Sequence, residues 1–274
     1  AYEISLGLVG SEMCIRDRDK DVVAAIHFDN QVAWYENDGD PSDGGWTHHI
    51  IKDYADACGT CGGMDDVFVA DMDGDGDTDV LSASAGDGTF GWYANDGTGN
   101  FGEKQTFHGG TYNHPNSVFT IDIDNDGDLD IVSSAMDNVS WHENNGDATI
   151  FNSYVISTSA GDTYAVYAYD IDEDGDIDVI VPSQGQGRVY WFENDGNQSF
   201  SSHLISASVS GAFSVFTTDL DNDGDQDVLS AGLGGQVAWH ENDGDENFTS
   251  FVITSEAVGA TCVHSSDVDG DGDM

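Results

Sequence analysis

Aspartate recurs in a fixed pattern that could bind a cation. The segment from Asp71 to Asp79 reads DMDGDGDTD, and closely similar strings start at Asp122, Asp170 and Asp219, with a shorter copy, DVDGDGDM, at the end of the chain. In each complete copy Asp occupies positions 1, 3, 5, 7 and 9, and Gly occupies position 6. Alternate carboxylates can converge on one point while the glycine allows a sharp turn, as in the calcium loop of an EF-hand.

The ligand chemistry of these acidic loops favours calcium. All candidate ligands are oxygen atoms, and no His or Cys lies inside a loop, which argues against zinc and copper. Mg²⁺ fits less well because it keeps its bound waters and rarely accepts a cage made only of protein atoms. We predict about one Ca²⁺ per complete loop, with the backbone carbonyl rather than the side chain of position 7 as ligand. The alternative is a solvated acidic turn that binds nothing. The predicted metal-site residues are Asp71, Asp73, Asp75, Asp77 and Asp79; Asp122, Asp124, Asp126, Asp128 and Asp130; Asp170, Asp172, Asp174, Asp176 and Asp178; Asp219, Asp221, Asp223, Asp225 and Asp227; and Asp267, Asp269, Asp271 and Asp273.

The segments around each loop predict four short strands per repeat. The loops begin about 49 residues apart, and apolar runs such as VFVAD and DVLSA flank them. A motif such as VYWFENDG follows at a fixed offset, and then a further short apolar run such as HLIS. Four β-branched and aromatic runs separated by Gly, Asn and Asp turns are typical of a four-stranded antiparallel sheet, and Asn-Asp-Gly indicates a tight hairpin.

Such sheets must stack on one another. A single sheet of this length has two apolar faces and cannot bury both alone, and radial stacking gives a β-propeller with four-stranded blades. We predict an all-β propeller over residues 19–274, with about five blades present. The Trp that recurs in every repeat is expected to pack between blades, and the Glu two residues later is interpreted as scaffold, because chemistry needs one site rather than five. These residues are Trp34, Trp92, Trp141, Trp191 and Trp239, and Glu36, Glu143, Glu193 and Glu241.

The combined pattern has a family resemblance. D-x-D-x-D-G-D-x-D, an apolar strand and W-[YHF]-E-N-D-G together resemble the FG-GAP or VCBS-type repeat of secreted bacterial proteins, and are similar to the calcium-binding blades of integrin α-chains. The resemblance implies a seven-bladed parent propeller, stabilised by calcium, secreted or on the bacterial cell surface, and used for adhesion or ligand binding. Lectins and a few polysaccharide lyases and sugar dehydratases are built on similar scaffolds. Ala94 departs from the pattern, since other copies have Glu there.

Both ends of the sequence look cut. Asp17, Asp19 and Asp21 align with the second half of a further loop, but the preceding GSEMCIRDR resembles translated sequencing-adapter read-through at the end of a metagenomic assembly. We interpret residues 1–18 as a non-native or disordered leader; an ordinary divergent N-terminus is the alternative. At the other end Met274 occupies position 8 of the last loop. We therefore expect a fragment whose parent carries further blades or domains.

The composition excludes several partners. With 53 acidic and 6 basic residues the formal net charge is −47, which argues against nucleic acid as a partner. No apolar run is long enough for a membrane span, so we expect no direct membrane insertion. The chain is 38% hydrophobic and 11% aromatic, which is enough for a sizeable core.

Residues that differ between repeats are the candidates for a ligand site. Exposed aromatic, amide and cationic side chains suit sugar recognition, although they are equally ordinary turn residues, and Arg188 could hold an acidic sugar. These candidates are Tyr112, His114, Asn116, Tyr164 and Arg188. Cys58 and Cys61 lie in an unusually long connection, where a local disulfide is favoured over free thiols or zinc, and Cys262 is expected to be a buried free thiol in a strand.

These observations predict a calcium-binding extracellular propeller that acts as an adhesion or ligand-binding module for a polysaccharide or an extracellular protein. One alternative is a carbohydrate-active enzyme, a polysaccharide lyase or sugar dehydratase, on the same scaffold. We assign no catalytic residue, because only His27, His114 and His264 break the repeat pattern as acid/base candidates. A structural spacer of a larger surface protein is the other alternative.

Overall fold

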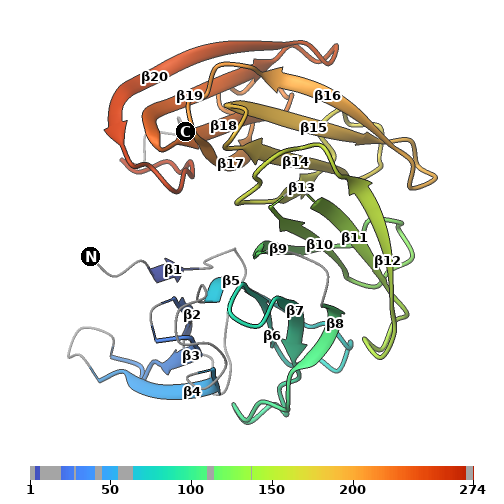
Figure 1. The fold of residues 1–274 in the computed structure, drawn as a ribbon, viewed down its shortest axis with the longest axis vertical. Helices are drawn as coiled ribbons and strands as arrows, with labels where there is room; N and C mark the ends of the chain where they lie inside the picture. Colours follow the sequence, from blue (N-terminus) through green and yellow to red (C-terminus); the bar gives the residue numbers. More distant parts are fainter. Residues whose placement is uncertain are drawn as a thin grey trace. The chain divides into compact units, whose positions relative to one another are not determined.

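A computed structural model describes residues 4–6, 20–27, 29–40, 45–54, 64–109, 114–136, 138–269 and 274. All regular structure in these segments is β, arranged as five four-stranded antiparallel sheets with the strands of each sheet adjacent in chain order (Figure 1). The predicted all-β class and four-stranded blades are confirmed, and the blades are consistent with part of a β-propeller. No helix in the described segments is long and apolar enough to cross a membrane.

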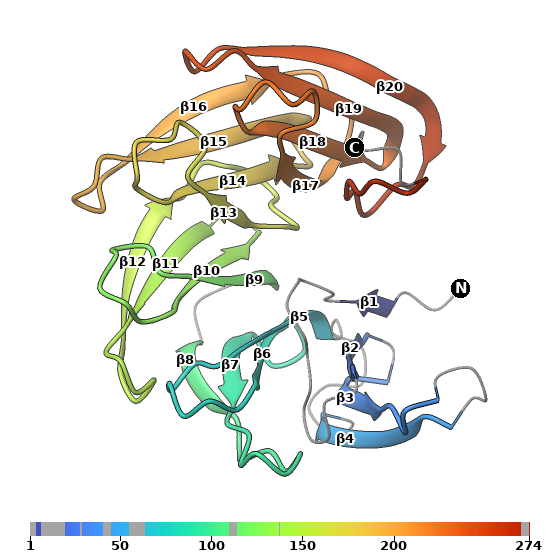
Figure 2. The same ribbon diagram turned by 180° about the vertical axis from the view of Figure 1, so that it is seen from behind.

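Each blade contributes four strands. The first has β1 (Ile4–Leu6), β2 (Val22–Ile26), β3 (Gln31–Glu36) and β4 (Thr47–Asp53), and the second has β5 (Met64–Ala70), β6 (Asp79–Ser84), β7 (Thr89–Tyr93) and β8 (Gln105–Gly109). The third has β9 (Pro115–Ile121), β10 (Asp130–Ala135), β11 (Asn138–Asn144) and β12 (Phe151–Ser157). The fourth has β13 (Tyr167–Tyr169), β14 (Asp178–Ser183), β15 (Arg188–Asn194) and β16 (Phe200–Ser206), and the fifth has β17 (Ala212–Thr218), β18 (Asp227–Gly232), β19 (Gly234–Asn242) and β20 (Phe248–Val258), seen from behind in Figure 2.

The chain divides into two compact units. The first comprises Ala1–Thr120, Asp128–Ala135 and His142–Tyr154, and the second comprises Ile121–Gly127, Met136–Trp141 and Val155–Met274. The first unit therefore contains blades 1 and 2, and the second contains blades 4 and 5. The strands of blade 3 contain residues of both.

Cores form between blades within each unit. In the first unit Trp34 of β3 shares a buried cluster with Val67 and Val80 of blade 2. In the second unit Trp191 of β15 packs with Val215 and Val228 of blade 5. The prediction that the repeated Trp packs between blades is confirmed at these positions.

The strand after each complete acidic loop is wholly buried. Every residue of β6, β10, β14 and β18 is buried, because these strands lie second in their sheets and both of their faces are covered. Their sequences are accordingly continuous apolar and small runs rather than alternating ones. Each of these strands begins at position 9 of its loop, so the last loop carboxylate is carried into the interior.

The prediction for Cys262 is wrong. Cys262 is exposed, and residues 260–267 form no strand. A strand needs a ladder of backbone hydrogen bonds with a neighbour. This segment contacts blade 5 through a hydrogen bond from the Val263 amide to Ser214 Oγ at 3.3 Å and through the rings of His264 and Phe216, and neither contact belongs to such a ladder.

Candidate metal centres

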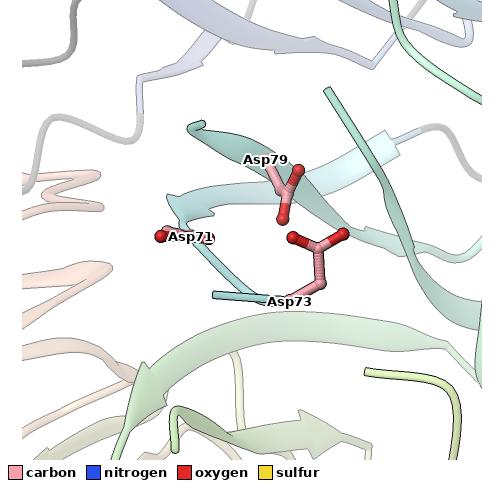
Figure 3. Close-up of side chains that lie close together, drawn as sticks. All are labelled: Asp71, Asp73 and Asp79. Carbon is pink, nitrogen blue, oxygen red and sulfur yellow. The ribbon is translucent and has the colours of Figure 1, made fainter. Parts of the chain in front are cut away.

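Positions 1, 3 and 9 of each complete acidic loop come together. One carboxylate oxygen from each of the three lies within 4.8 Å of the others. Figure 3 shows Asp73, on the loop, and Asp79, at the start of β6, with their carboxylates facing each other. The four groups are Asp71, Asp73 and Asp79; Asp122, Asp124 and Asp130; Asp170, Asp172 and Asp178; and Asp219, Asp221 and Asp227.

The carboxylate at position 1 and the glycine at position 6 set the shape of the loop. Asp71 Oδ2 accepts a hydrogen bond from the Gly76 amide at 2.9 Å, and Asp170 Oδ2 accepts one from the Gly175 amide at 3.0 Å. Gly76 and Gly175 have φ angles of 94° and 97°, a conformation that side chains rarely adopt. This is the physical reason for the invariant glycine in the pattern.

The aspartate at position 9 is an internal anchor. Asp79 is 0% exposed, and its two oxygens accept hydrogen bonds from the Asn95 amide at 2.8 Å and the Met72 amide at 2.9 Å. Burial raises the pKa of Asp79 to about 7, and it raises the pKa of Asp178, which occupies the same position, to about 7 as well. An anionic carboxylate is therefore costly here unless a positive charge compensates for its lost hydration.

The aspartate at position 1 carries an unsatisfied oxygen. Oδ1 of Asp71 and Oδ1 of Asp170 are buried and have no hydrogen-bond donor among the described residues. A buried acceptor without a partner costs free energy, and a carboxylate oxygen costs more than a neutral one. Both residues belong to the three-carboxylate groups, so a cation bound there could supply the missing partner. The donor set is all oxygen and anionic, which fits Ca²⁺.

Positions 5 and 7 lie outside the three-carboxylate groups. Asp75 Oδ1 accepts a hydrogen bond from the Asp77 amide at 2.9 Å. The Asp77 carboxylate packs against Gly97 of the following hairpin turn, where a Cβ atom would lie 2.5 Å from Asp77 Oδ2. The side chain of position 7 is therefore accommodated by the turn glycine of its own blade.

The incomplete loops are described only in part. Asp271 and Asp273 lie outside the described residues, as do Asp17 and Asp19. Asp21 aligns with position 9, is 2% exposed, and accepts a hydrogen bond from the Asn37 amide at 2.8 Å, as Asp79 does from Asn95.

An asparagine at the end of the Trp strand is hydrogen-bonded to the acidic loops. From the sequence, this residue was expected only to form part of a turn. Asn242 Nδ2 donates to Gln226 O in its own loop at 3.2 Å and to Ile171 O in the loop of blade 4 at 3.1 Å. Asn144 Nδ2 repeats this arrangement with Met72 O of blade 2 at 3.0 Å. The signal was the constant offset of this Asn from the repeated Trp in all five repeats.

The candidate ligand residues have diverse settings. His114 is exposed and Tyr164 stacks on Phe213 with ring centroids 4.9 Å apart. Asn116 was expected on an exposed loop, but it lies in β9, most of whose residues are buried, and is itself 5% exposed. Arg188 is exposed at the start of β15. Tyr112, Cys58 and Cys61 lie outside the described residues.

A Ser-His arrangement occurs twice and is structural. His142 Nδ1 lies 2.8 Å from Ser153 Oγ and its Nε2 lies 2.8 Å from Ser133 Oγ, which resembles a nucleophile beside a base. His240 makes the same pair of contacts in blade 5, with Ser250 and Ser230. Burial lowers the pKa of His142 to about 3, so it is too weak a base to activate a hydroxyl near neutral pH. The pair therefore replaces an apolar ring in the core rather than forming an active site.

Comparisons with known proteins agree with the repeat structure. A family model described as FG-GAP-like repeat matches residues 16–82, 71–133, 122–181, 170–230 and 219–274. No curated protein matches the chain. Among solved structures, an Agrocybe aegerita lectin that recognises non-reducing terminal N-acetylglucosamine is similar with a TM-score of 0.59 and 20% identity over 87% of this chain and 63% of the lectin chain. The V. cholerae biofilm matrix protein Bap1 is similar with a TM-score of 0.48 and 16% identity over 91% of this chain and 39% of that one. The chain thus spans less than two thirds of either protein. Because the five matches together extend over nearly all of its residues, this chain belongs to the FG-GAP-like repeat family.

Proposed function

We propose that this protein is a calcium-binding extracellular module that binds a polysaccharide or another extracellular protein. The observation that carries the calcium part is the repeated three-carboxylate group; in two of these groups a buried oxygen, of Asp71 or of Asp170, has no donor in the described part of the chain. A simple acidic turn would leave its carboxylates in water. In each complete loop of this chain three of the five aspartates come together, and the one at position 9 is completely buried.

Calcium would act as part of the fold. Carboxylates within 4.8 Å repel one another, so the loops should open without a cation. A bound cation stabilises the folded chain by RT ln(1 + [L]/Kd), about 1.4 kcal/mol per site at tenfold saturation. Calcium modules that work outside cells have Kd values of about 10⁻⁴–10⁻³ M, so loops of this kind would fill in an extracellular medium.

The binding part of the proposal rests on family and fold. Membership of the FG-GAP-like repeat family supports an extracellular role in ligand binding or adhesion. The similar lectin recognises a terminal sugar, which supports the idea that such blades can carry a glycan site. Loops that differ between blades, including the segments that carry Tyr164 and Arg188, are where this chain would place its own specificity.

Calcium binding is tested by melting the whole chain in calcium and in chelator, together with calorimetric titration. We expect a clear rise in melting temperature with calcium, and a smaller rise for Asp170→Asn, which removes one ligand charge from one loop. Asp245→Asn is the control, because this substitution makes the same charge change on an exposed turn outside the three-carboxylate groups. Equal melting temperatures in calcium and chelator, with no heat of binding, would contradict the proposal.

Ligand binding is tested by applying the calcium-loaded chain to a glycan array and to immobilised extracellular matrix proteins. We expect binding to at least one class that is lost in chelator. Binding to neither, by a chain that still shows calcium-dependent melting, would leave a structural spacer as the better interpretation.

A further inference from the structure

Arg188 is an exposed cation on a strongly acidic chain, and no acidic partner for it lies among the described residues. The sequence has 53 acidic residues and 6 basic ones. Lys52 Nζ lies 3.1 Å from Glu103 Oε2, and Nζ of the nearly buried Lys104 lies 3.3 Å from Asp87 Oδ2. Arg188, by contrast, is exposed and forms no ion pair with a carboxylate in the part of the chain that the structure describes.

The guanidinium is held in place by neutral groups. Arg188 Nη1 donates to Tyr190 Oη at 2.9 Å and to Gln186 Oε1 at 3.3 Å. Tyr190 Oη donates to the same Gln186 oxygen at 2.7 Å, and Gln186 Nε2 donates to Ser159 O at 3.2 Å. These bonds engage one nitrogen of the guanidinium fork. They fix its plane at the surface while its other N–H groups remain available for a ligand.

The other blades show that the scaffold does not require this cluster. At the position of Arg188 they carry neutral polar residues, namely Gln31, Thr89, Asn138 and Gln236. At the position of Tyr190 they carry small residues, namely Ala33, Gly91, Ser140 and Ala238. Blade 2 has Asp87 where blade 4 has Gln186, and that carboxylate neutralises Lys104. Blade 4 therefore has a cation and a phenol at positions where the other blades have neutral or small residues, and it has a neutral amide where blade 2 has the acid that pairs with its lysine.

We propose that Arg188, positioned by Tyr190 and Gln186, binds the carboxylate group of a uronic acid in an acidic polysaccharide. The inference rests on the proposed binding function and names its ligand class. A planar guanidinium matches a carboxylate through two parallel hydrogen bonds, and the adjacent tyrosine ring offers an apolar face to a sugar. A sulfate ester is another oxyanion that a sugar can carry, and the experiment separates it from a carboxylate.

The net charge limits how this site can work. At −47 the chain repels a polyanion at long range, although salt of physiological strength screens exposed charges beyond about 8 Å. The site would therefore discriminate between bound sugars rather than attract them from a distance. One exposed ion pair discriminates by up to about fivefold, so the preference should be modest for a short oligosaccharide.

The test measures calorimetric or interferometric affinity of the calcium-loaded whole chain for hyaluronan oligosaccharides, for their carboxyl methyl esters, and for dextran and dextran sulfate. We expect the free acid to bind up to about fivefold more tightly than the ester. Arg188→Gln, which installs the residue of Gln31 and Gln236, should abolish that preference. Tyr190→Phe should reduce it, because it removes the hydroxyl that positions the guanidinium. Lys52→Gln is the control with the same charge change and should keep it.

Equal affinity of the wild type for acid and ester, or a preference that persists in Arg188→Gln, would overturn the inference. Discrimination only between dextran sulfate and dextran would also overturn it in favour of a sulfate ligand. If calcium-dependent melting and array binding persist in either case, the proposed function stands and the uronate site alone fails. Melting curves of each variant in calcium distinguish loss of binding from loss of fold.

Discussion

Replacing Asn242 by alanine should weaken two acidic loops through one side chain. Asn242 is 3% exposed, and its Nδ2 donates to Ile171 O at 3.1 Å and to Gln226 O at 3.2 Å. Its Oδ1 accepts a hydrogen bond from the Gly244 amide at 3.3 Å. Alanine would leave these backbone groups without their partner, at a net cost of about 1 kcal/mol each and about 3 kcal/mol in all. The backbone amide bond to Asp227 Oδ1 would remain.

Asn194 provides the matched control in the same unit. It occupies the same position in β15, is 1% exposed, and its amide also donates to position 9 of its own loop, Asp178 Oδ1, at 2.8 Å. Among the residues that the structure describes, its side chain makes one hydrogen bond, from Nδ2 to Ile177 O at 3.2 Å, and its Oδ1 accepts none. Asn194→Ala should therefore cost only about 1 kcal/mol.

The assay is urea unfolding of both variants in saturating calcium and in chelator. In calcium we expect Asn242→Ala to lose about 2 kcal/mol more than Asn194→Ala, from the difference between three bonds and one. Its calcium-dependent gain in stability should also shrink more, because the Ile171 carbonyl lies next to Asp172, a member of the group in blade 4. Equal losses of stability in the two variants would show that the bond from Asn242 to the Ile171 carbonyl contributes nothing. That result would refute the idea that Asn242 couples the loops of blades 4 and 5.

Two further predictions concern the turn glycine and a buried histidine. Gly244→Ala should destabilise the chain by about 1–2 kcal/mol, because Gly244 has a φ of 74° and its Cβ would lie 2.6 Å from Asp225 Oδ2; thermal melting should show partial rescue by Asp225→Ala. Burial lowers the pKa of His240 from 6.5 to about 4, so below pH 6.5 the unfolded state gains a proton that the folded state does not. As the pH falls between these two pKa values, the free energy of unfolding should fall by about 1.4 kcal/mol per pH unit. A Ser230→Val, His240→Phe double variant should lack this pH dependence in urea unfolding. An unchanged slope of stability against pH in the double variant would contradict the prediction.

Much of the architecture could be predicted because the same sequence pattern occurs in every repeat. Trp34 and Trp191 recur at one offset, so their packing between blades follows from the need of each sheet to cover two faces. The aspartates at positions 1, 3 and 9 converge in the structure because the glycine at position 6 reverses the chain, as the loop pattern indicated. The calcium itself stays a prediction.

Other features depend on tertiary contacts that a pattern does not encode. Asn242 looks like an ordinary residue of an Asn-Asp-Gly turn, and its bond to blade 4 exists only because that blade packs beside it. Cys262 lies in a segment that resembles the strands before other loops, yet a strand also needs a ladder partner. Two further positions are informative only as a pair. Ser230 and His240 hydrogen-bond to each other in blade 5, and blade 4 has the apolar residues Val181 and Phe192 at the equivalent positions.

The contacts around position 9 explain why the acidic loops and the blades should respond to calcium together. In the second unit, Asp178 holds the Ile171 amide and the Asn194 amide, and the Ile171 carbonyl in turn accepts the side chain of Asn242. The Asn242 amide is bound by Asp227 of the next loop. A cation that fixes one loop therefore fixes a peptide group to which the next blade is hydrogen-bonded, and the Ile171 side chain is buried in the core between those blades. Ordering one site lowers the entropic cost of ordering its neighbour, so calcium should bind to successive loops of this unit with positive cooperativity. That cooperativity should disappear in Asn242→Ala, while a titration with independent sites in the wild type would show that the loops fold separately.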